Sequence, residues 1–282
     1  MVSEQLQKKI DRAVKLLQSV ANGYDGEIEV AYSGGKDSDV ILQLAKESGI
    51  RYRAIYKNTT IDPAGTLKHC KDMGAEVIKP KKNFFELVAD NGFPGQFMRF
   101  CCRYLKEYKV LDKAIMGVRK AESTKRNARY NEPTECRYYG KKSPENHVEA
   151  IYPILDWTDE DVREFIIDRN IQLAPHYYDA DGSLHTERRL GCMCCPLASK
   201  NKRIAQFKQW PNMVKAYIRA GQKFRDNHPN AKNLQKYSSV YEWFVRDVFY
   251  ETEAKWQASK GCLFDEEIDY KAFIEQQFNI TL

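Results

Sequence analysis

The stretch EIEVAYSGGKDSDVI, residues 27–41, has the pattern of a strand followed directly by a glycine turn and the start of a helix. Residues 27–32 alternate in polarity and are rich in β-formers, which predicts a strand. Val40 and Ile41 begin an apolar pattern of helical spacing that ends near Gly49. A strand that turns at once into a helix is typical of an α/β sheet.

The turn itself, Ser33-Gly34-Gly35-Lys36-Asp37-Ser38, has the chemistry of an anion site. Its two glycines carry no Cβ, so backbone amides can approach an anion closely. The start of the helix adds a partial positive charge, Lys36 adds a full one, and the two serine hydroxyls are further donors. The turn is therefore predicted to bind phosphate, although the Gly-x4-Gly-Lys-Ser/Thr spacing of a Walker A loop is absent.

Strands and helices alternate along the chain on both sides of this stretch. Apolar positions at helical spacing predict helices over residues 2–20, 66–73, 84–89 and 97–114. Segments rich in β-formers predict strands over residues 51–56, 75–78, 114–118 and 148–154. Thr158, followed by three acidic residues, predicts a capped helix start. This alternation predicts an α/β fold with a parallel twisted sheet flanked by helices.

Three parts of the chain differ in pattern. We expect an N-terminal helix within residues 1–26, the α/β domain over residues 27–196, and a helical C-terminal region over residues 197–282. Inside the α/β domain, residues 119–147 are polar and show no period, which predicts a long loop.

The bulk composition indicates a globular protein of the cytoplasm. The 282 residues are 43% hydrophobic and carry a formal net charge of +6, a mild excess that suits an anionic ligand. No apolar run approaches membrane-spanning length, and the first residues show no secretory signal, so we expect no membrane partner. The eight cysteines are then expected in a reducing compartment, where clustered thiols usually bind metal.

The glycine turn resembles the PP-loop of the ATP-pyrophosphatase superfamily. Gly117-Val118-Arg119-Lys120-Ala121-Glu122-Ser123 resembles the Gly-x-Arg-x-x-Glu-Ser signature of the phosphoadenosine phosphosulfate (PAPS) reductase family, and residues 152–162 resemble its next strand and helix. The resemblance covers about residues 27–196 and implies an adenine nucleotide α-hydrolase-like fold. It implies that ATP or a related adenylate binds with Mg²⁺, which Asp37 would help to position.

The resemblance and the residue chemistry together give a candidate site. Guanidinium groups match phosphate or sulfate with paired hydrogen bonds, so Arg119 and Arg126 are candidate substrate clamps, and Glu122 could orient one of them. The alternative is an exposed basic loop that is merely solvated. We expect catalytic roles for Lys36, Asp37, Arg119, Glu122 and Arg126. We expect nucleotide contacts from Ser33, Gly34, Gly35, Lys36, Asp37, Ser38, Gly117 and Ser123.

The cysteines form two tight groups. Cys101-Cys102 is a tandem pair, and Cys192-Met193-Cys194-Cys195-Pro196 follows ninety residues later. This layout resembles the cluster-bearing adenylylsulfate reductases of the family, which implies a [4Fe–4S] cluster on Cys101, Cys102, Cys192 and Cys195. Adjacent cysteines suit a tetrahedral zinc site poorly.

Other roles remain open for individual cysteines. Cys194 could replace a neighbouring ligand or could be a reactive thiol. Buried cysteine acting as a small apolar residue explains Cys70, and it is one reading of Cys262.

The resemblance leads to one preferred function. The family's C-terminal Glu-Cys-Gly-x-His segment, whose cysteine attacks the sulfonate sulfur, does not occur in this sequence, and Cys194 or Cys262 would have to replace it. We therefore expect a nucleotide-coupled sulfur transfer, in which an acceptor oxygen is adenylated with release of pyrophosphate and sulfur is then inserted. DNA phosphorothioation sulfur-insertion enzymes resemble this arrangement, and a sulfur donor protein is a possible partner.

Two alternatives stay open. One is direct reduction of adenylylsulfate or phosphoadenylylsulfate to sulfite. The other is a non-catalytic regulator that binds a nucleotide or nucleic acid, since residues 119–142 hold eight Lys and Arg against three Glu, with tyrosines between them. We prefer to read this basic stretch as a lid over the nucleotide.

Overall fold

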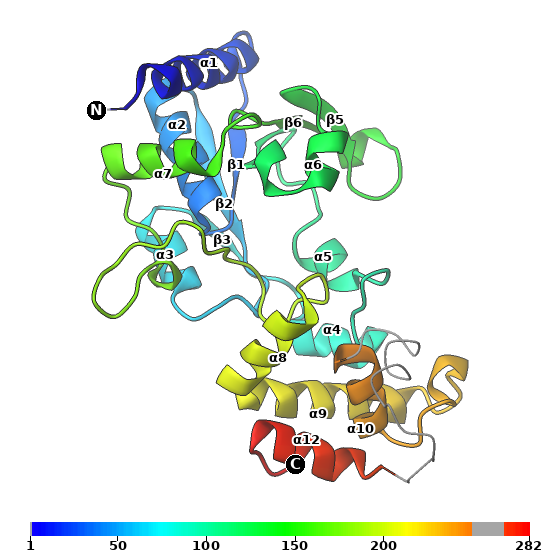
Figure 1. The fold of residues 1–282 in the computed structure, drawn as a ribbon. Helices are drawn as coiled ribbons and strands as arrows, with labels where there is room; N and C mark the ends of the chain where they lie inside the picture. The colour runs from blue at the N-terminus through cyan, green and yellow to red at the C-terminus, as the bar shows by residue number, and fades with distance from the viewer. Residues whose placement is uncertain (1, 250–267) are drawn as a thin grey trace. The chain divides into compact units, whose positions relative to one another are not determined.

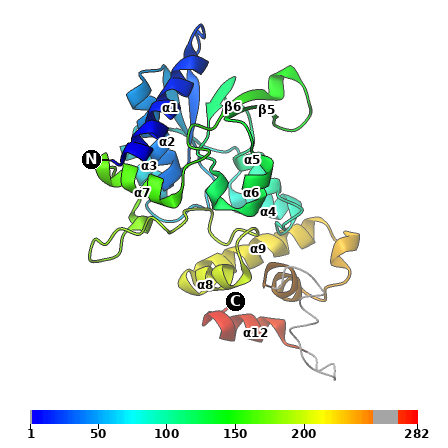
Figure 2. The same cartoon turned by 45° about the horizontal axis from the view of Figure 1, so that its top comes forward.

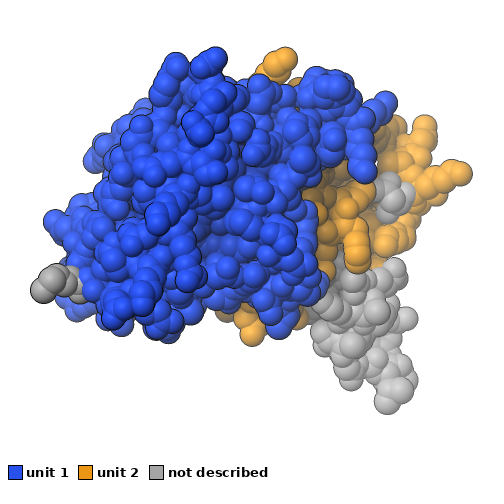
Figure 3. Space-filling view, turned by 90° about the horizontal axis from the view of Figure 1, so that it is seen from above, with its two compact units in different colours: residues 1–58, 62–79, 107–191 blue, residues 59–61, 80–106, 192–282 orange. Residues whose placement is uncertain are grey.

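The computed structural model describes residues 2–249 and 268–282 of the chain, except the side chains of residues 233 and 249 (Figure 1). The described chain forms two compact units, which Figure 3 shows in different colours. Unit 1 consists of residues 1–58, 62–79 and 107–191, and unit 2 of residues 59–61, 80–106 and 192–282. The two units do not follow the boundaries that we expected near residues 26 and 196, and those boundaries stay predictions.

Unit 1 is built on a six-stranded sheet with the strand order β3-β2-β1-β4-β6-β5. Five strands are parallel, and β5 pairs with β6 antiparallel at one edge. The strands are β1 (Ile28–Tyr32), β2 (Tyr52–Lys57), β3 (Glu76–Ile78), β4 (Lys113–Ile115), β5 (Thr134–Tyr138) and β6 (His147–Ile151). The predicted parallel sheet flanked by helices is thereby confirmed.

The sheet is covered on both faces because its central strands alternate between two apolar clusters. Ile115 and Ile151 belong to the larger cluster, whereas their neighbours Ala114 and Ala150 belong to a smaller one. The larger cluster also contains residues of α1 (Glu4–Ala21), α2 (Lys36–Ser48) and α7 (Asp159–Asp168). Figures 1 and 2 show these three helices grouped on one side of the sheet.

Local sequence explains how the flanking helices start. Helix α1 buries Leu6, Ile10, Ala13 and Leu17, the stripe that its apolar spacing predicts. Helix α7 begins at a reciprocal capping box, in which Thr158 accepts from the amide of Asp161 and Asp161 accepts from the amide of Thr158. Helix α3 (Thr66–Asp72) follows β2 and leads to β3.

Two expectations about secondary structure are wrong. Only Phe100–Leu105, helix α5, is helical within residues 97–114, and Lys113–Ile115 is the central strand β4. Residues 119–147 are not a loop, because they contain α6 (Thr124–Arg129) and β5. Strand β5 forms through pairing with β6, and β4 through pairing with both β1 and β6. The local residue pattern does not carry these contacts. Residues 134–138 of the expected lid form an edge strand of the sheet, and the lid itself stays a prediction.

Unit 2 is helical, as expected for the C-terminal region over its described residues. It contains α4 (Phe84–Asn91), α5, α8 (Lys200–Gln209), α9 (Pro211–Asn227), α10 (Val240–Trp243), a π-helical turn (Phe244–Phe249) and α12 (Tyr270–Phe278). Its core is aromatic, with the rings of Phe84, Phe207 and Phe244 arranged around Tyr217. Helices α4 and α9 pack side by side in this core.

Candidate functional site

The predicted phosphate loop of unit 1 connects the buried central strand β1 to helix α2. Gly34 has a φ of +73°, which L side chains rarely adopt. A Cβ at this position would lie 3.0 Å from Cys70 Sγ and 3.1 Å from Thr66 Cγ2 of helix α3. Gly34 is therefore required both by its backbone conformation and by the closeness of α3.

The backbone amides of the first helical turn have different partners. Lys36 N–H donates to the hydroxyl of Tyr177 at 3.0 Å, and Ser38 N–H donates to Gly35 O at 2.8 Å. Among the described residues, the amide of Asp37 has no acceptor. The amide of Asp37 is thus a loop donor that remains available to an anion, at the positive end of the helix.

A cleft of about 250 Å³ lies beside the loop, entirely within unit 1. The residues that line it are Ala31, Ser33, Gly35, Lys36, Asp37, Ser38, Gly117, Val118, Glu122, Arg126, Tyr177, Arg189 and Leu190. Lys36 is only 4% exposed, and its Nζ lies 3.8 Å from Asp37 Oδ2. Burial lowers the pKa of this ammonium group, because a charge is less well solvated there.

Gly117 and Arg119 support the loop from the neighbouring segment. A Cβ at Gly117 would lie 3.0 Å from the backbone oxygen of Asp37, so a side chain there would push against the backbone of the loop. Arg119 is 1% exposed and donates from Nε to Asp37 Oδ1 and from Nη2 to Asp159 Oδ1, each at 2.7 Å. Arg119 does not line the cleft, and its two carboxylate partners differ from the substrate contact that we expected.

The opposite side of the cleft carries a cluster of charges. The Glu122 carboxylate pairs with both Arg126 and Arg189, the latter at 3.1 Å. Burial and the neighbouring charge of Arg189 lower the pKa of Arg126, which marks a local excess of positive charge. Ser123 does not line the cleft. Its side chain caps helix α6 by accepting from the amide of Arg126.

Two polar residues of the cleft, Tyr177 and Arg189, are not among the site residues that the sequence predicts. Tyr177 belongs to a short 3₁₀ turn, Pro175–Tyr177, and Arg189 follows it in an irregular segment. Neither belongs to a motif that we recognised, and both reach the loop from about 150 residues away in the chain. The adjacent basic residues Arg188 and Arg189 are the one signal in the sequence, but they lie just before the cysteine group of residues 192–195, and nothing local assigns them to the cleft.

A buried polar triad lies behind the loop. Tyr32, at the end of β1, donates to Asp39 in the first turn of α2, and His69 Nε2 of α3 lies 3.0 Å from Asp39 Oδ1. The hydroxyl of Tyr32 also lies 3.0 Å from His69 Nε2. Burial raises the pKa of Asp39, the only fully buried carboxyl among the described residues. The triad joins the three elements that hold the glycine loop.

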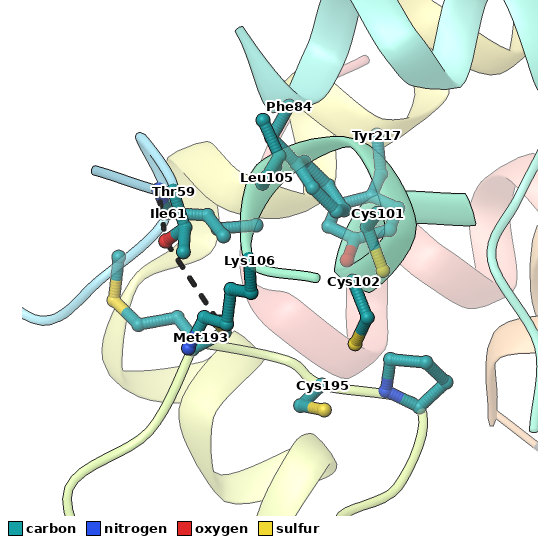
Figure 4. A pocket seen from close by; sticks show the side chains of 12 residues that line it. Thr59, Ile61, Phe84, Cys101, Cys102, Leu105, Lys106, Met193, Cys195 and Tyr217 are labelled. Carbon is teal, nitrogen blue, oxygen red and sulfur yellow. Dashed lines mark hydrogen bonds between the residues drawn. The ribbon is translucent and has the colours of Figure 1, made fainter. Parts of the chain in front are cut away.

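The cysteines of the two expected groups come together in unit 2. Cys101, Cys102, Cys192 and Cys195 line one narrow pocket, together with Thr59, Lys106, Tyr217 and apolar side chains. Figure 4 shows the sulfur atoms of Cys101, Cys102 and Cys195 following one another along it. The hydrogen bond with Cys102 and burial raise the pKa of the Cys101 thiol. The four cysteines that were predicted as cluster ligands therefore line the same pocket.

Cys194 lies apart from these four. Its backbone has a φ of +53°, unusual for a residue other than glycine, and its amide donates to Gln206 Oε1 at 2.9 Å. The side chain is 2% exposed within the aromatic core of unit 2, and it does not line the pocket. Burial raises its pKa to about 12, which does not favour a reactive thiol. Cys262 lies outside the described residues.

The pocket has the donor atoms that a thiolate-bound metal group needs, but its thiols are not yet placed around a common centre. Four thiols with an apolar surround are the ligands that iron–sulfur clusters use. Within residues 2–249 and 268–282, however, no three Cys, His, Asp or Glu side chains are already grouped as metal ligands. The thiols would have to turn toward a common centre and lose their protons on binding. The donor set fits the group.

The fold and the loop define the class of protein. A parallel sheet whose central strand leads through Ser-Gly-Gly-Lys-Asp-Ser into a helix is the arrangement of the PP-loop superfamily. The chain belongs to the phosphoadenosine phosphosulfate reductase domain family, whose sequence profile matches residues 27–198. The resemblance predicted from the sequence is thereby confirmed.

Comparison with individual proteins gives more distant relatives. An uncharacterized protein of Methanocaldococcus jannaschii is 28% identical over 264 residues, and the match covers 83% of this chain. The match spans only 60% of that curated relative's length.

Two solved structures show weaker likeness. The phosphoadenylyl-sulfate reductase of Candida auris, in a phosphate complex, is 14% identical, with a TM-score of 0.43 over 62% of this chain and 90% of the other. The U34-tRNA thiolase NcsA of Methanococcus maripaludis, with its [4Fe-4S] cluster, is 16% identical, with a TM-score of 0.40 over 86% and 90%. With TM-scores below 0.5, neither likeness supports an inference about function. No described helix is long and apolar enough to cross a membrane.

Proposed function

We propose that this chain binds ATP or a related adenylate by its phosphates in the cleft of unit 1 and uses it in sulfur transfer. One observation carries the proposal. The buried ammonium of Lys36 lines a cleft whose other lining residues include two arginines that share one carboxylate, Glu122. A buried ammonium group beside two arginines that share one carboxylate favours a polyanionic ligand.

Each group of the cleft has a role in binding phosphate. The open amide of Asp37 and the hydroxyls of Ser33 and Ser38 are donors, and Lys36 supplies a charge at the helix start. The guanidinium of Arg126 offers paired donors to a second anionic group of the ligand. Together these groups would hold a pyrophosphate unit and orient the α-phosphate toward an acceptor.

Asp37 is the candidate contact for Mg²⁺. Arg119 fixes one oxygen of its carboxylate, while Asp37 still lines the cleft. Carboxylate oxygen is a ligand that Mg²⁺ prefers, and the ion when bound would neutralise the phosphates. Arg119 is in this account a positioning residue for Asp37.

The proposed reaction is adenylation. An acceptor oxygen attacks the α-phosphorus, the new bond forms between that oxygen and phosphorus, and the bond to the β-phosphate oxygen breaks to release pyrophosphate. The acceptor becomes activated, because AMP is a better leaving group than hydroxide. A sulfur nucleophile can then displace AMP and form the carbon–sulfur or phosphorus–sulfur bond.

The cysteine pocket of unit 2 would hold a [4Fe–4S] cluster. Its candidate ligands are Cys101, Cys102, Cys192 and Cys195. When bound through all four thiolates, such a cluster would supply electron transfer, and it would offer a site for inorganic sulfur only if one iron kept no cysteine ligand. Lys106, which also lines the pocket, would offset negative charge on the thiolates. A persulfide-bearing donor protein is the proposed source of sulfur, and a thiol reductant would supply the two electrons that cleave the persulfide S–S bond.

Reduction of adenylylsulfate or phosphoadenylylsulfate is the second candidate, because the family to which the chain belongs takes its name from a phosphoadenosine phosphosulfate reductase. The products separate the two candidates. Anaerobically purified protein would receive ATP and Mg²⁺, or adenylylsulfate and a thiol, in parallel reactions. Slow cleavage of ATP to AMP and pyrophosphate, with water as acceptor, supports the adenylation proposal. Sulfite release from adenylylsulfate without ATP cleavage would favour reduction instead.

A further inference from the structure

Tyr177 is part of the candidate cleft although it belongs to no recognised motif. Its side chain is 1% exposed, and it is one of the residues that line the cleft. Its hydroxyl lies 3.5 Å from the position that a Cβ would take at Gly35 of the glycine loop. A phenol in this place is next to any group that the loop binds.

The hydroxyl of Tyr177 accepts a hydrogen bond but donates none to the described residues. A phenolic hydroxyl has one proton to donate and lone pairs that accept. The amide of Lys36 donates to the oxygen at 3.0 Å. Among the described residues, no group accepts a hydrogen bond from Tyr177. The acceptor side of the hydroxyl is therefore occupied, and its proton is left for something in the cleft.

The hydroxyl also keeps this proton under ordinary conditions. Burial raises the pKa of Tyr177 to about 12, above the ordinary value of a tyrosine. A buried donor without an acceptor is costly, so a ligand that supplies an acceptor gains affinity. The cations that share the cleft, Lys36 and Arg126, indicate that this acceptor is an anion.

We propose that Tyr177 is a ligand-binding residue whose hydroxyl donates to a phosphoryl oxygen of the bound nucleotide. This inference rests on the proposed function of the cleft and names the group of the ligand that is recognised. Phosphate-bearing ligands such as ATP and pyrophosphate should depend on the hydroxyl. Adenosine has no phosphoryl oxygen and should not depend on it.

The test is a binding comparison with the Tyr177→Phe variant, which keeps the ring and removes the hydroxyl. Calorimetric titration would measure the affinity of ATP, inorganic pyrophosphate and adenosine for the full chain. We expect ATP and pyrophosphate to bind about tenfold or more weakly, as for a lost hydrogen bond to a charged group, and adenosine to bind unchanged. Tyr178→Phe is the matched control, because the Tyr178 hydroxyl accepts from Leu173 N at 3.2 Å and does not line the cleft.

Two outcomes would overturn the inference. The first is equal pyrophosphate affinity in Tyr177→Phe and in the wild-type chain. The second is an equal loss of affinity for adenosine and for ATP. Such a loss would mean that the substitution disturbs the whole cleft and not one contact with a phosphoryl oxygen. The comparison of the two ligands distinguishes these cases even if the variant has a lower Tm. Failure of the proposed function looks different, because the wild-type chain itself would then bind neither ATP nor pyrophosphate.

Discussion

Arg119 Nε donates to Asp37 Oδ1 at 2.7 Å, from a guanidinium that is almost completely buried. The other end of the same fork donates to Asp159 at 2.7 Å. The pair connects the segment after β4 to the glycine loop. The charge of Arg119 is therefore used to hold Asp37 and Asp159 within the protein. This arrangement fixes the carboxylate of the loop before any ligand arrives.

Replacing Arg119 should damage stability and binding together. Arg119→Met leaves the Asp37 carboxylate without its buried partner, so we expect the free energy of unfolding to fall by about 3 kcal/mol or more. Urea denaturation measures this change. Asp159→Asn is the control, because Asp159 is largely exposed and should cost less than about 1 kcal/mol. Equal stability of Arg119→Met and the wild-type chain would argue against the positioning role.

The glycine loop should tolerate no side chain at Gly34. Gly34→Ala combines a positive φ with close contact to Cys70 and Thr66, whereas Gly49→Ala has a similar φ of +69° and open space around it. We expect Gly49→Ala to lose about 1 kcal/mol of stability and Gly34→Ala to lose at least twice as much. Thermal unfolding of both variants measures this. Equal losses would show that the contact with α3 is unimportant.

The buried triad predicts a pH dependence of stability. Because burial raises the pKa of Asp39 above the ordinary 3.8, the folded chain binds this proton more tightly than the unfolded chain. The stability that comes from Asp39 is therefore complete below pH 3.8 and is lost as the pH rises through the folded-state pKa. Asp39→Asn removes this loss, although its weaker hydrogen bonds to Tyr32 and His69 add a constant cost.

The measurement is urea denaturation of Asp39→Asn and of the wild-type chain between pH 4 and pH 7. We expect the stability of the variant relative to the wild-type chain to increase with pH over this range. A difference that is the same at every pH would mean that Asp39 has an ordinary pKa in the folded chain.

The cysteine pocket predicts which thiols retain iron. Serine at Cys101, Cys102, Cys192 or Cys195 should each lower the iron content of anaerobically purified protein. Cys136→Ser, at an exposed site on β5, is the control and should retain it. Iron and sulfide analysis with an absorption spectrum measures the outcome. Stoichiometric zinc, or iron that survives all four substitutions, would contradict the assignment.

A substitution at Cys194 tests whether this residue replaces one of the four expected ligands. Its side chain is buried away from the pocket, so Cys194→Ser should keep iron while it loses about 1–2 kcal/mol of stability for burying a hydroxyl. Loss of iron in Cys194→Ser with unchanged stability would instead identify Cys194 as a ligand.

Local patterns predicted much of unit 1. The strand, glycine turn and helix of residues 27–49, the stripe of α1 and the Thr158 cap depend on neighbours within a few positions, and the structure has all three. Residues 119–147 were misread because β5 is a strand only through its pairing with β6. Pairing between segments leaves little trace in the polarity of a short edge strand.

The site divides in the same way. Lys36, Asp37 and Ser38 are adjacent in sequence, and the structure places all three along the cleft. Tyr177 and Arg189 reach the cleft only through the fold, from segments without periodicity. Asp159, the partner of Arg119 on α7, lies forty residues further along the chain. The family signature therefore predicts an arginine at position 119 but not the carboxylate that it contacts.

Pyrophosphate binding tests the central claim most directly. Calorimetric titration with inorganic pyrophosphate and Mg²⁺ would compare the wild-type chain, Lys36→Ala, and Lys46→Ala, an exposed lysine of the same helix. The account predicts that Lys36→Ala loses about tenfold or more in affinity while Lys46→Ala binds as the wild-type chain does. Equal affinity in all three proteins would contradict a phosphate site at the glycine loop.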